Sequence, residues 1–215
     1  MYDFDGGPYP ARVRIAIAEL DLLERFDKWV RVDLRDGTHK TPQFIRLNYS
    51  GTLPVVELKD GTYIAECVAI TQFLDDLKEE RQLTGRTPKE QGLIHMFTRR
   101  VELEVMNPIS TYFHHATPGL GPKVEIYQNK DYGLNQRDKA LAGLHHFNKI
   151  LADKEFITGE YLSMADIALI GALIFFHLLK VDIPEECEHV SAWFKKMQER
   201  PSVQGQLEMF ESRRV

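Results

Sequence analysis

The first eighty residues contain segments of helical periodicity separated by short apolar stretches. Apolar residues recur every three or four positions across 12–24 and again across 66–77, which predicts two amphipathic helices. A third, shorter helix is expected at 42–47, because Thr41 can cap it and Pro42 suits its first turn.

Strand-like segments lie between these helices. Short apolar or alternating runs, typical of strands, occur at 2–4, 29–34, 54–58 and 62–65. Asp60-Gly61 separates the last two runs and is a strong hairpin signal. The predicted order is therefore strand, helix, strand, helix, strand, strand, helix, a mixed α/β domain.

The rest of the chain is predicted to be all-helical. After a charged segment broken by Gly85 and Pro88, long helices are expected at 88–115, 135–154, 164–180 and 188–199, followed by a polar tail. The change in periodicity predicts one domain at 1–80, a linker at 81–88 and a second domain at 89–215. We expect α/β plus all-α architecture.

A capping box marks the start of the most apolar helix. Ser163 is its expected N-cap and Asp166 the acidic partner three residues later, while Leu162 and Ile167 form a hydrophobic staple. The helix that follows is apolar nearly all round, which predicts the buried centre of the second domain. Asp166 is therefore expected to be structural rather than catalytic.

Composition and charge exclude several classes of protein. The chain has 43% hydrophobic and 27% charged residues, which is typical of a globular protein. Its net charge of −5 argues against binding to nucleic acid or to an anionic membrane, because proteins that bind these partners present a basic face. No apolar run reaches the roughly 18 residues of a membrane span, and no signal peptide is evident. Cys67 and Cys187 form no CxxC pair, which favours a reducing cytoplasm.

The predicted element order and three motifs resemble the cytosolic glutathione transferase family, in its bacterial type. The motifs are GPYPARVRIAIAE at 7–19, NYSGTLPVVELKDGTYIAECVAITQFL at 48–74 and SMADIAL at 163–169. The resemblance covers the whole chain and implies a thioredoxin-like N-terminal domain and an all-helical C-terminal domain. It also implies glutathione as co-substrate, a homodimer, a role in detoxification, and conjugation of the glutathione thiol to an electrophilic, apolar substrate or a related glutathione-dependent reaction.

The resemblance assigns the cysteinyl and γ-glutamyl parts of glutathione to four residues. Leu53 precedes Pro54 in a peptide bond that the family has in the cis form, and its backbone is expected to pair with the cysteinyl backbone. Glu66 and Cys67 begin a helix, whose free N–H groups and positive dipole end suit the γ-glutamyl carboxylate. The Glu66 carboxylate is expected to take the ligand ammonium.

The glycyl carboxylate is assigned to His39 and Lys40, which precede the short second helix. Taken singly, such residues have structural interpretations: a solvated lysine, a first-turn acid, a plain strand entry. Their joint occurrence in the family order favours the ligand site.

Two positions depart from the family pattern. Where members carry Cys or Ser before the proline of the first helix, this chain has Gly7, so no side chain there can stabilise the glutathione thiolate. Backbone N–H groups near Gly7 and the hydroxyl of Tyr9 are the remaining candidates for catalysis. Cys67 replaces the usual Ser or Thr and offers only a weak S–H donor.

An electrophile pocket is implied at Tyr9 and, in the first long helix, at Met106 and Phe113, although aromatic stripes also form ordinary cores. The neighbouring pairs His114-His115 and His145-His146 point about 100° apart on a helix, so neither suggests a metal site.

Two alternatives to a transferase remain open from the sequence. Gly7 and Cys67 favour a non-enzymatic interaction or regulatory module on the same fold. A glutathione-dependent thiol–disulfide enzyme that uses Cys67 is the other. The electrophile is not identified by any motif.

Overall fold

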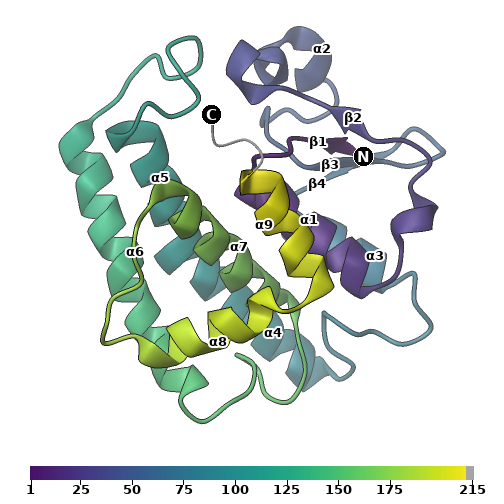
Figure 1. Cartoon of the computed structure of the whole chain (residues 1–215). Helices are drawn as coiled ribbons and strands as arrows, with labels where there is room; N and C mark the ends of the chain where they lie inside the picture. The colour runs from purple at the N-terminus through teal and green to yellow at the C-terminus, as the bar shows by residue number, and fades with distance from the viewer. Residues whose placement is uncertain (212–215) are drawn as a thin grey trace.

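The N-terminal part of the computed structural model, which describes residues 1–211, is built on a four-stranded sheet (Figure 1). Its strands are β1 (Tyr2–Asp3), β2 (Val30–Arg31), β3 (Val55–Glu57) and β4 (Tyr63–Ala65), in the order β2-β1-β3-β4. β1 pairs parallel with β2 and antiparallel with β3, and β4 is antiparallel to β3. The strand predicted over 29–34 is shorter in the structure, where it is β2, and a 3-10 turn begins at Leu34.

Three α-helices accompany this sheet: α1 (Pro8–Glu19), α2 (Pro42–Ile45) and α3 (Cys67–Asp75). α1 packs against α3, and the buried side chains of α1 include Val13, Ala16 and Ile17, as the helical stripe predicted. Thr41 caps α2 by accepting from the Phe44 N–H. Gly61 has a φ of +84° in the predicted hairpin turn between β3 and β4. The mixed thioredoxin-like fold expected for this part is confirmed.

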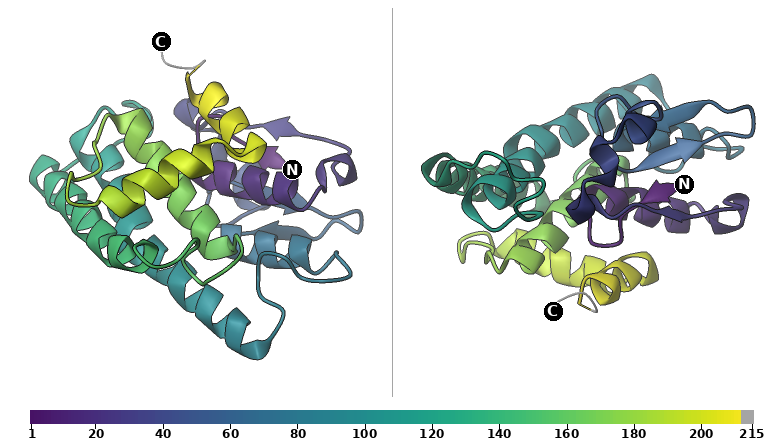
Figure 2. Two further views of the ribbon diagram at one scale, coloured as in Figure 1. Left: turned by 60° about the horizontal axis from the view of Figure 1, so that its bottom comes forward. Right: turned by 90° about the horizontal axis from the view of Figure 1, so that it is seen from above.

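The remaining helices form a second layer beside the sheet (Figures 1 and 2). They are α4 (Pro88–Val101), α5 (Asn107–Ala116), α6 (Lys130–Leu151), α7 (Met164–Leu179), α8 (Glu188–Gln198) and α9 (Pro201–Glu211). Two expectations were wrong. The helix predicted over 88–115 is interrupted by a π-helical turn, Glu102–Met106, and much of the predicted polar tail is helix α9, which packs on α1.

Helix α7 is the buried centre of the helical part, as predicted. All its residues from Met164 to Phe176 are buried, and it packs against both α1 and α4. The capping box is present: the Ser163 N–H donates to Asp166 Oδ2 over 2.9 Å. Asp166 Oδ1 also accepts from the Ile157 N–H at 2.8 Å, so the carboxylate is structural. No helix within residues 1–211 is long and apolar enough to cross a membrane.

Candidate functional site

A cavity of about 260 Å³ lies where the N-terminal part meets the start of α5. Its lining residues are Tyr9, Ser50, Thr52, Leu53, Pro54, Glu66, Cys67 and Asn107. The structure thus brings five of the predicted site residues together from three separate segments of the chain. Ser50, Thr52 and Asn107 were missed by the sequence analysis.

The wall formed by Leu53 and Glu66 has an unusual backbone. The Leu53–Pro54 peptide bond is cis, as the resemblance implied. Glu66 has a φ of +70° and a ψ of 125°, a conformation uncommon for a residue with a side chain and often associated with functional sites. α3 begins directly after it, so the unpaired N–H groups of its first turn lie beside the cavity. This end of α3 is suited to a carboxylate.

Cys67 is the first residue of α3 and its thiol is buried, with 7% of the residue exposed. Its Sγ donates to the backbone oxygen of Tyr9 over 3.3 Å, which ties α3 to α1. Burial raises the pKa of the Cys67 thiol to about 11, although the charge of Arg12 acts in the opposite direction. The thiol is therefore protonated at neutral pH and is a poor nucleophile.

Gly7 is the N-cap of α1 and has no room for a side chain. A Cβ at this position would lie 2.8 Å from Cδ of Pro10 and 3.3 Å from the backbone oxygen of Phe4. Few backbone N–H groups are free to bind a ligand here. The Gly7 N–H already donates to Phe4 O over 3.0 Å, and Pro8 and Pro10 carry no N–H. The first turn of α1 therefore offers a single backbone donor, the N–H of Tyr9.

The Tyr9 side chain crosses from α1 to the helical part. Its hydroxyl donates to Asn107 Oδ1 over 3.0 Å and also interacts with the side chain of Ser110. Burial raises the pKa of Tyr9 to about 12, so the phenol is neutral and remains a hydrogen-bond donor at physiological pH.

His39 and Lys40 lie next to the cavity rather than in its lining. His39 is 4% exposed and its Nδ1 has no hydrogen-bond partner. Burial and the neighbouring Lys40 charge lower the pKa of His39, so its imidazole is neutral at neutral pH. Gly51 has a φ of +61°, and a Cβ there would be 2.8 Å from His39 O and 3.5 Å from Lys40 Nζ. Glycine thus lets the segment between Ser50 and Thr52 approach both residues.

The residues expected to form an electrophile pocket lie in different environments. Tyr9 lines the cavity, whereas Met106 is completely buried in the core and does not reach it. Phe113 is half-buried on α5 and packs edge-on against Phe175 of α7, with ring centroids 5.3 Å apart.

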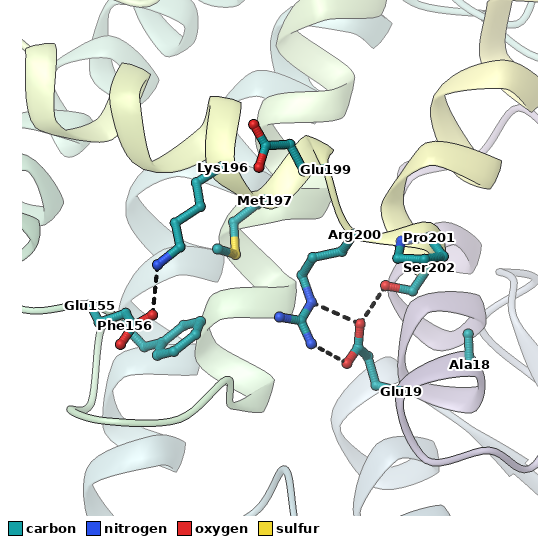
Figure 3. A pocket seen from close by; sticks show the side chains of 10 residues that line it. All are labelled: Ala18, Glu19, Glu155, Phe156, Lys196, Met197, Glu199, Arg200, Pro201 and Ser202. Carbon is teal, nitrogen blue, oxygen red and sulfur yellow. Dashed lines mark hydrogen bonds and ion pairs between the residues drawn. The ribbon is translucent and has the colours of Figure 1, made fainter.

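A larger cavity, of about 740 Å³, lies elsewhere, between the end of α1 and the junction of α8 and α9 (Figure 3). Its charged groups face one another: Arg200 pairs with Glu19 through two hydrogen bonds, and Lys196 Nζ lies 2.6 Å from Glu155 Oε1. The first pair joins the segment between α8 and α9 to α1, and the second joins α8 to the loop before α7. These side chains already have charged partners, so they are poorly placed to bind a charged ligand. Among residues 1–211 no cluster of His, Cys, Asp or Glu is arranged to hold a metal ion.

Two family models that together match most of the chain describe the same family. A family model for the glutathione S-transferase N-terminal domain matches residues 6–77, and one for the C-terminal domain matches 102–201. The chain is 56% identical to Glutathione S-transferase 2 of Saccharomyces cerevisiae, over 97% of this chain and 89% of that protein. It is 30% identical to the Escherichia coli glutathione S-transferase GstA, over 83% of this chain and 84% of that one.

Solved structures show the same similarity. The crystal structure of Gtt2 from S. cerevisiae superposes with a TM-score of 0.93 at 56% identity, covering 96% of this chain and 99% of that one. A glutathione S-transferase domain-containing protein of Marinobacter aquaeolei superposes with a TM-score of 0.90 at 42% identity, covering 94% and 98%.

Proposed function

Since this chain belongs to the glutathione S-transferase family and has its transferase function, with glutathione as co-substrate, we propose that the 260 Å³ cavity is where glutathione binds and reacts. The observation that carries this proposal is the convergence of Leu53, Glu66 and the start of α3 on one cavity that Tyr9 also lines. The substrate joined to glutathione is an electrophilic, largely apolar compound.

The cavity and the residues next to it offer a separate group for each part of the tripeptide. The γ-glutamyl carboxylate binds the free N–H groups at the start of α3, and its ammonium binds the Glu66 carboxylate. The cysteinyl backbone pairs with the Leu53 backbone. The glycyl carboxylate extends past Ser50 toward Lys40 Nζ, and His39, whose backbone oxygen lies beside Gly51, adjoins the same segment.

The sulfur of glutathione then lies near the start of α1. The thiol loses its proton to solvent, and the thiolate is stabilised by the Tyr9 N–H, the backbone donor left in place of a side chain at Gly7. The Tyr9 hydroxyl adds to this only when its one proton turns from Asn107 Oδ1 to the sulfur. The thiolate attacks the electrophilic carbon, a C–S bond forms, and the leaving group departs with its electron pair. For an addition reaction, the carbanion takes a proton from water instead.

The thiol–disulfide alternative is disfavoured by the environment of Cys67. A reactive thiol in that chemistry is exposed and has a lowered pKa. Cys67 is buried, donates to Tyr9 O, and has a raised pKa.

We also propose that the chain has one domain at 1–80 and a second at 89–215, joined by a linker at 81–88. We further propose that it is a cytoplasmic homodimer that detoxifies electrophiles. Support for the dimer comes from exposed apolar side chains on α4 and the π-turn that follows. Met96 is 37% exposed and Leu103 45% exposed, and they are seven residues apart, near the same face.

Glutathione binding tests the proposal directly. Titration calorimetry of the wild type should show binding, and Glu66→Gln should weaken it about tenfold or more, because the ligand ammonium loses its charged partner. The exposed Glu185→Gln exchange on the helical part is the matched control and should bind like the wild type. No heat from the wild type at millimolar glutathione, or equal affinity of Glu66→Gln, would contradict the proposed site.

A further inference from the structure

Three residues along the 260 Å³ cavity form a continuous chain of contacts. Cys67 Sγ donates to Tyr9 O over 3.3 Å, and the Tyr9 hydroxyl donates to Asn107 Oδ1 over 3.0 Å. Cys67 begins α3, Tyr9 lies in the first turn of α1 and Asn107 begins α5, and all three line the cavity. Tyr9 therefore joins the start of α5 to the start of α3.

The π-turn before α5 directs Asn107 toward α1. In a regular α-helix of 3.6 residues per turn, side chains five residues apart point about 140° away from each other. Here the Asn107 N–H bonds to Glu102 O, five residues back, which closes one wide turn. Glu102 Oε1 lies 3.0 Å from Arg12 Nη2 on α1. The side chains of Glu102 and Asn107 therefore both face α1.

The contact with Tyr9 determines which end of the Asn107 amide is free. The Tyr9 hydroxyl donates its one proton to Oδ1, and burial, which raises the pKa of Tyr9 to about 12, keeps that proton on the phenol. The other end of the amide is therefore Nδ2, with two N–H donors. Within residues 1–211, Nδ2 has no hydrogen-bond partner, and Asn107 is exposed where it lines the cavity.

The start of α3 offers a ligand only its backbone donors. The thiol proton of Cys67 is directed at Tyr9 O, and an ionised Glu66 is an acceptor only. The free N–H groups of a helix start point along the helix axis, so they approach a bound carboxylate from one side. A carboxylate has about four lone-pair sites and can accept a further hydrogen bond from a donor outside α3.

We propose that Asn107 Nδ2 binds the α-carboxylate of the γ-glutamyl group together with the N–H groups of α3, and that Tyr9 is the positioning residue of this amide. The inference rests on the proposed placement of glutathione in the cavity. A reversed amide would turn Oδ1 toward the carboxylate and repel it, and the Tyr9 hydroxyl opposes this reversal because it needs an acceptor. The hydroxyls of Ser50 and Thr52 lie in the segment before Leu53, along which the glycyl end extends.

Two glutathione analogues isolate this carboxylate. The α-carboxylate is absent from γ-aminobutyryl-cysteinylglycine, and the ammonium is absent from glutaryl-cysteinylglycine. In calorimetry, Asn107→Ala should weaken glutathione and the glutaryl analogue about 10- to 100-fold, because a hydrogen bond to a charged group is lost, and should change binding of the γ-aminobutyryl analogue less than about twofold. KM for glutathione should rise with kcat nearly unchanged. Asn135→Ala, at an exposed position of α6, is the matched control and should bind like the wild type.

The isosteric Asn107→Asp gives a second measurement with glutathione alone. It keeps an acceptor for Tyr9 but replaces the amide donor with a negative charge. Glutathione should bind this variant more weakly than Asn107→Ala, because two carboxylates then lie next to each other. Tighter binding would show that the side chain faces the ammonium, and equal binding that it faces no charged group; either result overturns the inference.

Tyr9→Phe, made in both backgrounds, tests the positioning role. It should weaken glutathione binding in the wild type, leave the γ-aminobutyryl analogue unaffected, and add less than about twofold to Asn107→Ala, because the amide that it orients is already absent. An equal loss in both backgrounds would contradict this role.

The outcomes separate this inference from the site on which it rests. If Glu66→Gln weakens glutathione binding and Asn107→Ala does not, the site stands and the inference is wrong. An equal loss with glutathione and both analogues, or a loss of kcat at unchanged affinity, also overturns it, since neither is specific to the carboxylate. If the wild type binds no glutathione, the proposed site fails, and the inference with it.

Discussion

At the scale of the single residue, the most distinctive position is Gly7, where the family pattern has a cysteine or a serine. The Pro10 ring and the Phe4 carbonyl occupy the space into which a Cβ would project. A glycine here is therefore required by the local packing and does not indicate a lost activity. Because the prolines on either side of Tyr9 carry no N–H, the N–H of Tyr9 is the backbone donor left free at this helix start.

Restoring the family side chain should therefore fail to raise activity. Gly7→Ser should lower the free energy of unfolding by about 1–3 kcal/mol, the usual effect of overpacking, because the Pro10 ring cannot move aside freely. Its kcat should not exceed that of the wild type, since the start of α1 must shift to admit a side chain at this position. Urea denaturation and a conjugation assay with an activated aryl halide measure both effects. A stable Gly7→Ser with higher kcat would contradict this account.

At the scale of the element, α7 is defined by its N-terminus as much as by its apolar composition. Asp166 is fully buried and accepts hydrogen bonds from Ser163 and from Ile157, the latter in the preceding loop. Burial raises the pKa of Asp166 to about 6, even though these hydrogen bonds favour the carboxylate. The capping box thus joins the α6–α7 connection to the helix at the centre of the core.

This raised pKa predicts a pH dependence of stability. The folded pKa lies above the unfolded value of 3.8, so proton binding favours the fold; the contribution is complete below about pH 4 and is lost as the pH rises through 6. Relative to Asp166→Asn, which does not titrate, the wild type should lose up to about 3 kcal/mol of unfolding free energy between pH 4 and pH 7. Denaturant unfolding at each pH measures the difference, and for the exposed Asp153→Asn control it should stay constant. A constant difference for Asp166→Asn would refute the raised pKa.

At the scale of the whole molecule, the candidate site depends on contacts between segments as far apart in the chain as Tyr9 and Asn107, which are 98 residues apart. α1 contacts α3, α7 and α9, so the helix that carries Tyr9 lies between the sheet and the helical layer (Figure 2). The cavity takes Leu53 and Glu66 from one side and Asn107 from the other. The exposed apolar side chain of Met96 on α4 lies where we propose that a second copy binds.

The proposed dimer can be disrupted at that face. Met96→Glu should shift the mass measured by light scattering from that of a dimer toward 24.9 kDa, because a charge is placed in an apolar contact. Leu23→Glu, which alters a 61% exposed leucine far along the chain from α4, is the control and should leave the mass unchanged. Equal masses for the wild type and Met96→Glu would argue against α4 as the interface.

By itself, the sequence determined the features that depend on neighbouring residues. Local periodicity located the amphipathic helices, Asp60-Gly61 the hairpin and Ser163 with Asp166 the capping box, because propensity, capping and turn geometry act over a few positions. The motif around Leu53-Pro54 and Glu66 indicated a glutathione site through its resemblance to a family. Helix α9 was missed because its apolar positions are few and its partner, α1, is distant in the sequence.

Only the tertiary structure decided how the site is completed. A period of 3.6 residues cannot reveal one wide turn inside a helix, so the π-turn and the direction of Asn107 were hidden from sequence analysis. The steric restriction at Gly7 depends on how the chain folds back from Phe4 to Pro10, and the partner of Arg12 lies 90 residues away. Such contacts are set by the packing of α1 against the helical layer, which no local pattern encodes.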